Sequence, residues 1–202
     1  MKGKALIKLE HLSILEINGK GSFELLQGQI TSDMEKVSLD NCVVGSICDI
    51  KGRVVSSFIT SKNAKENNSF FLVGETKALV ATKTVLEKYQ PFYDCSLRLR
   101  KDFKFYAIEE GCLISDFPES NLDVSSQNYG SFFRLHYLEK KYHLIAFLES
   151  EEFKSYNISN DKLPGELDEI INQNFEITSE VINKFTPHEL GYHLNTRIDF
   201  EK

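Results

Sequence analysis

The sequence predicts an α+β protein built from antiparallel sheets, with helices packed on one face. Two strand-like runs at residues 43–48 and 54–60 flank a polar Asp-Ile-Lys-Gly turn. A strand at 70–73 leads into the clearest helix, 77–89, and two more strands follow at 95–100 and 104–108. The order strand, strand, helix, strand is that of a ferredoxin-like (split βαβ) plait, so we expect plait modules with antiparallel sheets.

The N-terminal elements follow from apolar periodicity and capping residues. Residues 12–17 form the first predicted strand. Ser22 is expected to cap a helix that ends at Gly28, because glycine leaves the helical region at little cost. Thr31 or Ser32 can then cap a short helix through a side-chain oxygen.

Alternation within the strand 54–60 predicts that Val55, Ser57 and Ile59 point to one face of the sheet and Val54, Ser56 and Phe58 to the other. Further along the chain, residues 116–129 contain Pro, Ser and Asn with few apolar side chains and predict a loop. The remaining expected elements are a hairpin of 132–137 with 142–148, short helices over 151–156 and 166–173, a helix that starts at Pro187, and a strand at 198–200.

Composition limits the classes of partner. The chain has 202 residues, of which 41% are hydrophobic, enough for a sizeable core. A net charge of -6 with interspersed signs argues against direct nucleic-acid binding through phosphate neutralisation. No apolar run is long enough to span a membrane and no signal-peptide core is evident, so we expect no membrane contact and a cytoplasmic location.

No metal site is predicted. His188 and His193 are five residues apart, a poor fit for joint ligation from one helix. The four cysteines show no metal-ligand spacing and are expected to be reduced. Cys48 lies in a predicted strand, so we expect a packed thiol rather than a reactive thiolate.

The turn between the two hairpin strands is one candidate binding site. It places Asp49, Lys51 and Arg53 at one exposed tip. From the residues alone, an ordinary charged hairpin is the favoured alternative. A basic cluster further along the chain has two interpretations. Its charges protect the edge of a sheet, or they bind an anionic tail. Its members are Arg98, Arg100, Lys101 and Lys104.

Two motifs carry a resemblance to a known family. Residues 26–33 read Leu-Gln-Gly-Gln-Ile-Thr-Ser-Asp, and residues 48–53 read Cys-Asp-Ile-Lys-Gly-Arg. With residues 185–190 and 198–202, they resemble the YgfZ family, folate-binding relatives of the glycine-cleavage T protein, an aminomethyltransferase. In that family the last segment runs into a Lys-Gly-Cys signature, whose Lys corresponds to Lys202. The resemblance therefore implies that the signature Cys and a C-terminal barrel domain are absent here.

The resemblance implies a folate-binding aminomethyltransferase-like fold with interlocked modules. Residues 1–51 plus 149–202 are expected to form a discontinuous first folate-binding module, and residues 52–148 a ferredoxin-like central module. Tetrahydrofolate is the expected cofactor. The residues expected to bind it are Gln29, Thr31, Asp33, Asp49, Lys51, Gly52, Arg53 and Ser57.

Function is implied by the same resemblance. In the aminomethyltransferases the strand after the turn carries paired aspartates, and here the matching residues are Ser56 and Ser57. A hydroxyl cannot replace a carboxylate that stabilises a developing iminium, which disfavours catalysis. The expected role is an accessory protein for assembly or repair of iron–sulfur enzymes, with an indirect effect on tRNA modification and no catalytic residues of its own. The alternatives are a folate-dependent aminomethyltransferase and a degenerate, non-catalytic binding module.

Two departures and one further expectation accompany the resemblance. Leu12 stands where the family has a Trp that stacks on the folate, and residues 167–178 depart from the family's Glu-Ala-Gly-x-Pro run. Loss of the aromatic ring would remove about 0.5–1.5 kcal/mol of stacking. An open C-terminal side is expected to favour self-association.

Overall fold

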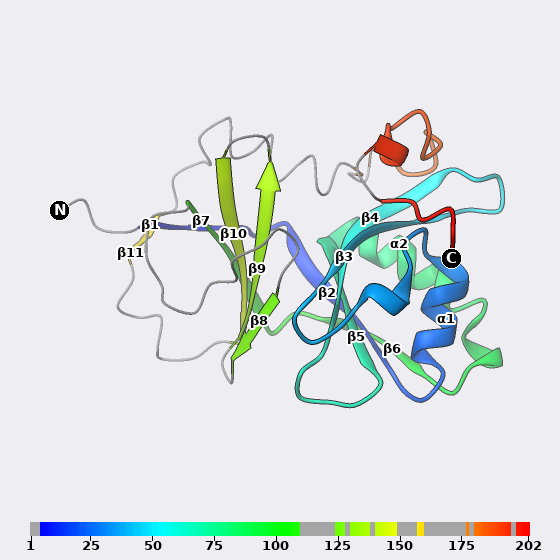
Figure 1. The fold of residues 1–202 in the computed structure, drawn as a ribbon, viewed down its shortest axis with the longest axis horizontal. Helices are drawn as coiled ribbons and strands as arrows, with labels where there is room; N and C mark the ends of the chain where they lie inside the picture. Colours follow the sequence, from blue (N-terminus) through cyan, green and yellow to red (C-terminus); the bar gives the residue numbers. More distant parts are fainter. Residues whose placement is uncertain are drawn as a thin grey trace.

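Two sheets, mainly antiparallel, lie side by side in the computed structural model, and the α-helices of the described residues lie on one of them (Figure 1). The structure describes residues 5–109, 124–127, 130–137, 140–148, 157–159, 177, 180–194 and 197–202. The α+β class predicted from the sequence is confirmed. Among these residues, no helix has the length and apolar character needed to cross a membrane.

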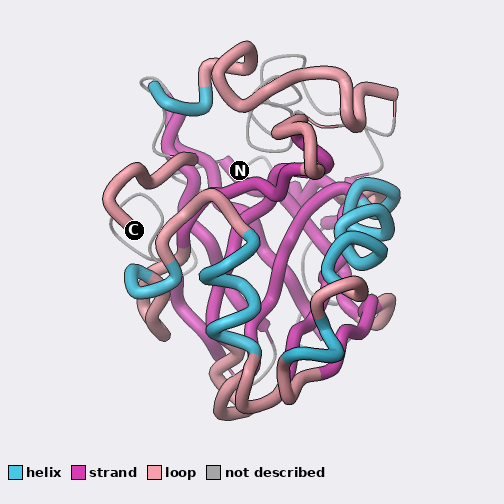
Figure 2. Tube along the Cα trace, turned by 90° about the vertical axis from the view of Figure 1, so that its right-hand side faces the viewer, coloured by secondary structure: helices cyan, strands magenta, loops and turns pink. Residues whose placement is uncertain are grey.

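The sheet that carries the helices has five strands, each antiparallel to its neighbours. In spatial order these are β3 (Val43–Cys48), β4 (Val54–Lys62), β5 (Ser69–Glu75), β2 (Leu12–Asn18) and β6 (Ser96–Arg100). Each strand had been predicted to within two residues at either end. The helices α1 (Ser22–Gln29) and α2 (Thr76–Leu86) lie in front of the strands when viewed from the side of α1 (Figure 2).

Alternate strand residues supply the core beneath the helices, as the period of a strand requires. Leu15 and Ile17 of β2 and Leu72 of β5 are fully buried there against Leu26 of α1 and Leu79 of α2. The opposite face of the sheet is also covered. Toward β2 and β5 it meets the six-stranded sheet, where the Phe71 and Phe103 rings pack edge to face at 5.6 Å.

Strict alternation fails at the start of β4. The pairing with β3 shifts between Ile47 and Cys48, which is a β-bulge. A bulge adds one residue to one strand and reorients the side chains next to it. Val55 therefore packs in the core beneath the helices, on the same face as Ser56 and Phe58, and Val54 packs on the opposite face with Tyr192. The predicted grouping of Val55 with Ser57, and of Val54 with Ser56, is wrong for this reason.

Two predicted helix caps are corrected. Ser22 is the first residue of α1 and Gly21 holds the cap position, without a side-chain bond. Helix α1 also continues past Gly28 to Gln29. The short helix η1 (Met34–Lys36) is capped by Asp33, whose carboxylate accepts the backbone N–H of Glu35 at 3.0 Å.

The second sheet has six strands, in the spatial order β11 (Asn157–Ser159), β1 (Ala5–Lys8), β7 (Phe103–Glu109), β10 (Lys140–Leu148), β9 (Gly130–Tyr137) and β8 (Val124–Gln127). Among the strands that the structure describes, β1 and β11 pair in parallel and all other neighbours pair antiparallel. The predicted hairpin is confirmed by the pairing of β9 with β10. The loop predicted for 116–129 is wrong at 124–127, because this edge strand is polar and lacks an apolar pattern.

The predicted helices at 151–156 and 166–173 fall outside the described residues. No helix continues from Pro187: residues 187–190 form turns that lead to the short helix η4 (Tyr192–Leu194). Residues 198–200 form no strand. The predicted module boundary lies between residues 51 and 52. Strands β3 and β4, on either side of it, are neighbours in one sheet. The division of the chain into modules stays a prediction.

Candidate functional site

In the C-terminal segment, residues 180–194 and 197–202, the first part covers the face of the β3–β4 hairpin opposite the helices, and the last part passes the outer edge of β3 to the end of α1. Its backbone pairs with Val54, whose N–H donates to the Phe185 carbonyl at 2.8 Å and whose carbonyl accepts from Asn183 at 2.9 Å. Tyr192 is fully buried and packs with Val54 and Ile177. The chain end beside α1 is visible in Figure 1. This segment therefore covers the hairpin face on which Val54 lies.

Thr31 joins the C-terminal segment to the outer edge of β3. Its backbone N–H donates to the Ser46 carbonyl, and its hydroxyl accepts the Ser46 N–H, both at 2.9 Å. The same hydroxyl donates to the Arg197 carbonyl at 2.5 Å. The Thr31 carbonyl in turn accepts the Asp199 N–H at 2.9 Å. Every polar group of this residue thus takes part in the junction.

Ser57 lies beside this junction, because it is the cross-strand partner of Ser46. Its side chain is 2% exposed, and its hydroxyl has no hydrogen-bond partner within the part of the chain that the structure describes. Ser56 points to the other face, where its hydroxyl bonds that of Thr82 in α2. The two serines that match the family's aspartates therefore face opposite sides of the sheet.

Arg197 is a buried cation that the sequence analysis did not single out. It is 3% exposed, and its guanidinium carbon lies 4.8 Å from the centre of the Tyr192 ring. A guanidinium at this distance from an aromatic face gains a cation–π attraction. The signal available in the sequence was a lone arginine immediately before the apolar residue Ile198. Burial of that arginine depends on the segment folding back over β3, which the local sequence does not reveal.

A groove of about 540 Å³ opens next to the junction. It is lined by residues from η1, the start of β3 and the C-terminal segment, including Asp33, Cys42, Val43, His193, Asp199 and Phe200. Lys36 and Asp199 form an ion pair across it. The hydrogen bond from Lys36 lowers the pKa of Asp199, and the bond to Asp199 raises the pKa of Lys36.

Lys202 secures the end of helix α1. Its ammonium donates to the carbonyls of Gln27 at 2.8 Å and of Ser32 at 3.4 Å, and to that of Ile30. These carbonyls lie at or just beyond the C-terminal end of the helix, where a positive charge is favourable. Partial burial lowers the pKa of Lys202.

The hairpin turn is a self-contained unit. The Asp49 carboxylate accepts the backbone N–H groups of Lys51 at 2.8 Å and Arg53 at 2.9 Å, and Gly52 has a φ of +73°. This is the turn chemistry predicted from the sequence. Arg53 donates to the Lys184 carbonyl at 2.9 Å, so it also holds the C-terminal segment. Lys51 is exposed at the tip.

The eight predicted site residues therefore occupy three places. Thr31 and Ser57 lie at the junction beneath the C-terminal segment. Asp33 lines the groove, where its carboxylate accepts the Gln27 amide at 3.0 Å. The hairpin turn carries Asp49, Lys51, Gly52 and Arg53. Gln29 is partly buried at the end of α1, and whether any of these residues binds a ligand stays a prediction.

Cys48 is held as a neutral thiol. Burial, reinforced by the charge of Asp49, raises its pKa to about 11. Reactive cysteines have a depressed pKa. The raised pKa of Cys48 therefore agrees with the packed, unreactive thiol expected from its position in a strand.

Sequence comparison relates the chain to proteins named tRNA-modifying protein YgfZ. That of Colwellia psychrerythraea is 26% identical over 103 residues, which cover 51% of this chain and 31% of the relative. That of Aliivibrio fischeri is 24% identical over 127 residues, which cover 62% of this chain and 39% of the relative. That of Serratia proteamaculans is 33% identical over 82 residues, which cover 41% of this chain and 22% of the relative. The matches thus span between about a fifth and two fifths of each relative, and no protein-family model matches the chain.

Structural comparison gives the fold. The glycine cleavage system aminomethyltransferase T from Bartonella henselae superimposes with a TM-score of 0.60 at 15% identity. The match covers 72% of this chain and 42% of that protein. The chain is YgfZ-like in sequence, and it has the aminomethyltransferase fold that the resemblance implied.

Proposed function

We propose that this YgfZ-like chain binds a folate, tetrahydrofolate or a close relative, as an accessory protein in the assembly or repair of iron–sulfur enzymes. Its effect on tRNA modification would be indirect, through enzymes of that kind. The proposal is supported by the similarity to proteins named tRNA-modifying and by the aminomethyltransferase fold. Iron–sulfur proteins are the proposed partners, and their association with this chain is proposed to be indirect.

One observation carries the folate part of the proposal. The Ser57 hydroxyl is buried, and none of the described residues bonds it. A buried polar group without a partner costs about 1–3 kcal/mol. A ligand that displaces the residues covering this hydroxyl and brings its own donor or acceptor would remove that cost. A pterin ring, whose edge carries ring nitrogens, an amino group and a carbonyl oxygen, suits such a position.

The remaining contacts in the proposal divide by chemistry. Thr31 and Ser57 would bond the pterin edge, and Asp33 with Gln29 would border it from the end of α1. Lys51 and Arg53 carry positive charge at the hairpin tip and would attract the glutamate carboxylates, with Asp49 and Gly52 shaping the turn. Bound tetrahydrofolate would supply a one-carbon carrier, while this chain's own residues would bind and orient it.

The hydroxyls at this site favour binding over one-carbon transfer. Ser56 bonds Thr82 beneath α2, so only Ser57 faces the junction. Neither residue offers the negative charge that would stabilise a cationic transition state. An aminomethyltransferase activity therefore has no carboxylate at these two positions to support it.

Calorimetric titration with tetrahydrofolate under anaerobic conditions tests the binding proposal. We expect saturable binding that Ser57→Ala weakens, while the matched change Ser96→Ala, at an exposed serine of β6, leaves it unchanged. Lys51→Ala should weaken binding of polyglutamylated folate more than that of the monoglutamate. Absence of saturable binding at near-millimolar ligand would remove folate from the proposal.

Complementation tests the accessory role. In a strain that lacks its YgfZ protein, the readout is the level of thiomethylated tRNA. Restoration by the wild-type chain, and a weaker effect of Ser57→Ala at equal protein level, would support the proposal. If wild type and Ser57→Ala restore thiomethylation equally, the accessory role does not depend on the Ser57 site.

Self-association through the C-terminal side is a further part of the proposal. Leu194 and Phe200 line the groove and are 81% and 79% exposed. Exposed apolar side chains that share one groove favour association. Light scattering across concentration is the test: a mass that rises with concentration, and falls back in Phe200→Ser, supports it, and a strictly monomeric species contradicts it.

A further inference from the structure

The turn before η4 brings two imidazoles together. The Nδ1 atoms of His188 and His193 lie 3.1 Å apart, and their ring centres are 4.4 Å apart. Both side chains are exposed. Spacing along a helix had made the pair a poor candidate for joint ligation, but the segment is not a helix. It reverses direction at Gly191, whose φ of +67° suits glycine.

The backbone that carries the pair is fixed at both ends. Thr186 and Glu189 form a reciprocal cap: the Thr186 N–H donates to the Glu189 carboxylate at 2.7 Å, and the Glu189 N–H donates to the Thr186 hydroxyl at 3.3 Å. The Gly191 N–H donates to the His188 carbonyl at 3.0 Å. Tyr192, which lies between the two histidines in the sequence, is buried and anchors the turn in the core. Such fixation reduces the entropy lost when two side chains bind one ion.

We propose that His188 and His193 form a bidentate site for a divalent transition-metal ion, with Zn²⁺, Ni²⁺ or Cu²⁺ as the class of ion. Zinc–imidazole bonds are about 2.0–2.1 Å long, so two nitrogens on one ion stand about 2.9–3.4 Å apart at angles between square and tetrahedral. The observed separation of 3.1 Å falls in that interval. The ion takes the place of the hydrogen in the Nδ1–Nδ1 hydrogen bond between the two rings.

The surroundings of the two histidines favour a cation that keeps some coordination positions open. Glu189 follows His188 directly, and Thr186 holds its carboxylate in place, so a negative charge lies near the pair. Among the described residues there is no cluster of three or more His, Cys, Asp or Glu suited to a metal. The ion is therefore held by two protein nitrogens, and water or another ligand fills the remaining positions. His193 also lines the groove, which places these open positions at its rim.

The inference is independent of folate binding and is tested with metal alone. The protein is the 202-residue chain without a polyhistidine tag, in a non-coordinating buffer at pH 7.5. Zn²⁺ affinity is measured by calorimetry for wild type, His188→Gln, His193→Gln and the double variant. His11→Gln, at another exposed histidine, is the matched control. Near-ultraviolet circular dichroism of Tyr192 and its neighbours confirms that each variant is folded.

A chelating pair predicts a non-additive pattern. Each single substitution should lower Zn²⁺ affinity at least about tenfold, since removal of a ligand costs no less than loss of a supporting contact. The double variant should bind no more weakly than the weaker single variant, and His11→Gln should match wild type. Electron paramagnetic resonance of bound Cu²⁺ should show two imidazole nitrogens. Wild-type affinity in either single variant, a single coordinated imidazole, or no saturable binding by wild type would overturn the proposal.

Discussion

The hydroxyl of Thr31 donates to the carbonyl of Arg197 at 2.5 Å, across a sequence separation of 166 residues. Since the same oxygen accepts the Ser46 N–H at 2.9 Å, one threonine connects the edge of β3 to the C-terminal segment. The segment in turn buries the hairpin face that carries Ser57. Integrity of the proposed ligand site therefore depends on a side chain near the start of the protein.

Thr31→Val tests this dependence. Valine keeps the shape of threonine but leaves the Ser46 N–H and the Arg197 carbonyl without their partner. We expect a loss of about 1–3 kcal/mol in the free energy of unfolding, measured by urea denaturation. Thr84→Val, at an exposed helix position, is the matched control and should stay within about 0.5 kcal/mol. Hydrogen exchange of the Asp199 amide should quicken in Thr31→Val only, and equal losses in both variants would contradict the role of Thr31.

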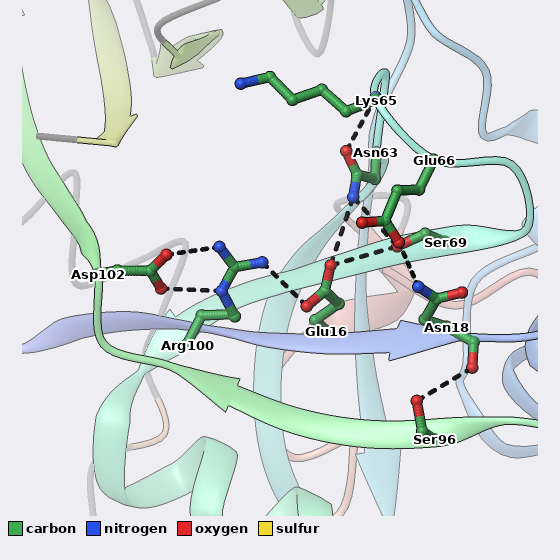
Figure 3. A network of polar contacts seen from close by, with 9 residues as sticks. All are labelled: Glu16, Asn18, Asn63, Lys65, Glu66, Ser69, Ser96, Arg100 and Asp102. Carbon is green, nitrogen blue, oxygen red and sulfur yellow. Dashed lines mark hydrogen bonds and ion pairs between the residues drawn. The ribbon is translucent and has the colours of Figure 1, made fainter. Parts of the chain in front are cut away.

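The crossing between the two sheets rests on a second polar network, in which Arg100 lies between Glu16 and Asp102 (Figure 3). The Glu16 side chain is 7% exposed and that of Asp102 is 49% exposed. Hydrogen bonds to Asp102 and Glu16 raise the pKa of Arg100. Arg100 also lies over the ring of Phe103, the first residue of β7, at 5.0 Å. This arrangement fixes where the chain leaves one sheet and enters the other.

Glu16→Gln should therefore cost far more stability than Asp102→Asn. The first change leaves the Arg100 charge partly buried without its buried partner, and we expect a loss of about 2–4 kcal/mol. The second breaks an exposed pair and should cost less than about 1 kcal/mol. Guanidinium denaturation would also screen exposed ion pairs, so urea at pH 7 is the appropriate measurement. Similar losses for the two variants would show that burial does not decide the contribution of Glu16.

Local chemistry in the sequence predicts a large part of this structure. The Asp49–Gly52 turn follows from an aspartate that can bond the backbone ahead of it and a glycine that accepts positive φ. What the sequence leaves open are contacts between distant segments. Neither the fold-back that buries Arg197 nor the approach of His188 to His193 has a local pattern. The bulge at Ile47 and Cys48 likewise reverses Val54 and Val55, because one extra residue changes the face of its neighbours.

Acid should loosen the groove through Asp199. The hydrogen bond from Lys36 lowers the pKa of Asp199 below its ordinary value of 3.8. A carboxyl whose pKa is depressed in the folded state contributes stability above its unfolded pKa, and that stability is lost as pH falls through the folded value. Carbon-detected NMR titration should give a pKa below 3.8 for Asp199, and Lys36→Gln should move it upward. An unchanged value in Lys36→Gln would remove the ion pair as the cause.

Cys48 should resist alkylation at neutral pH. With a pKa of about 11 its thiol is almost entirely protonated at pH 8. An ordinary cysteine of pKa about 8.5 is about one quarter thiolate at that pH, so iodoacetamide should modify Cys48 roughly 10²-fold more slowly than a free thiol. Asp49→Asn keeps an oxygen that can accept the turn's N–H groups but removes the neighbouring charge, and should quicken the reaction modestly, because burial is the larger cause. Mass spectrometry of the labelled peptides, with urea-unfolded protein as the reference, measures both rates. Labelling of native Cys48 at the unfolded rate would show that the thiol is not packed against Val54 and Tyr192.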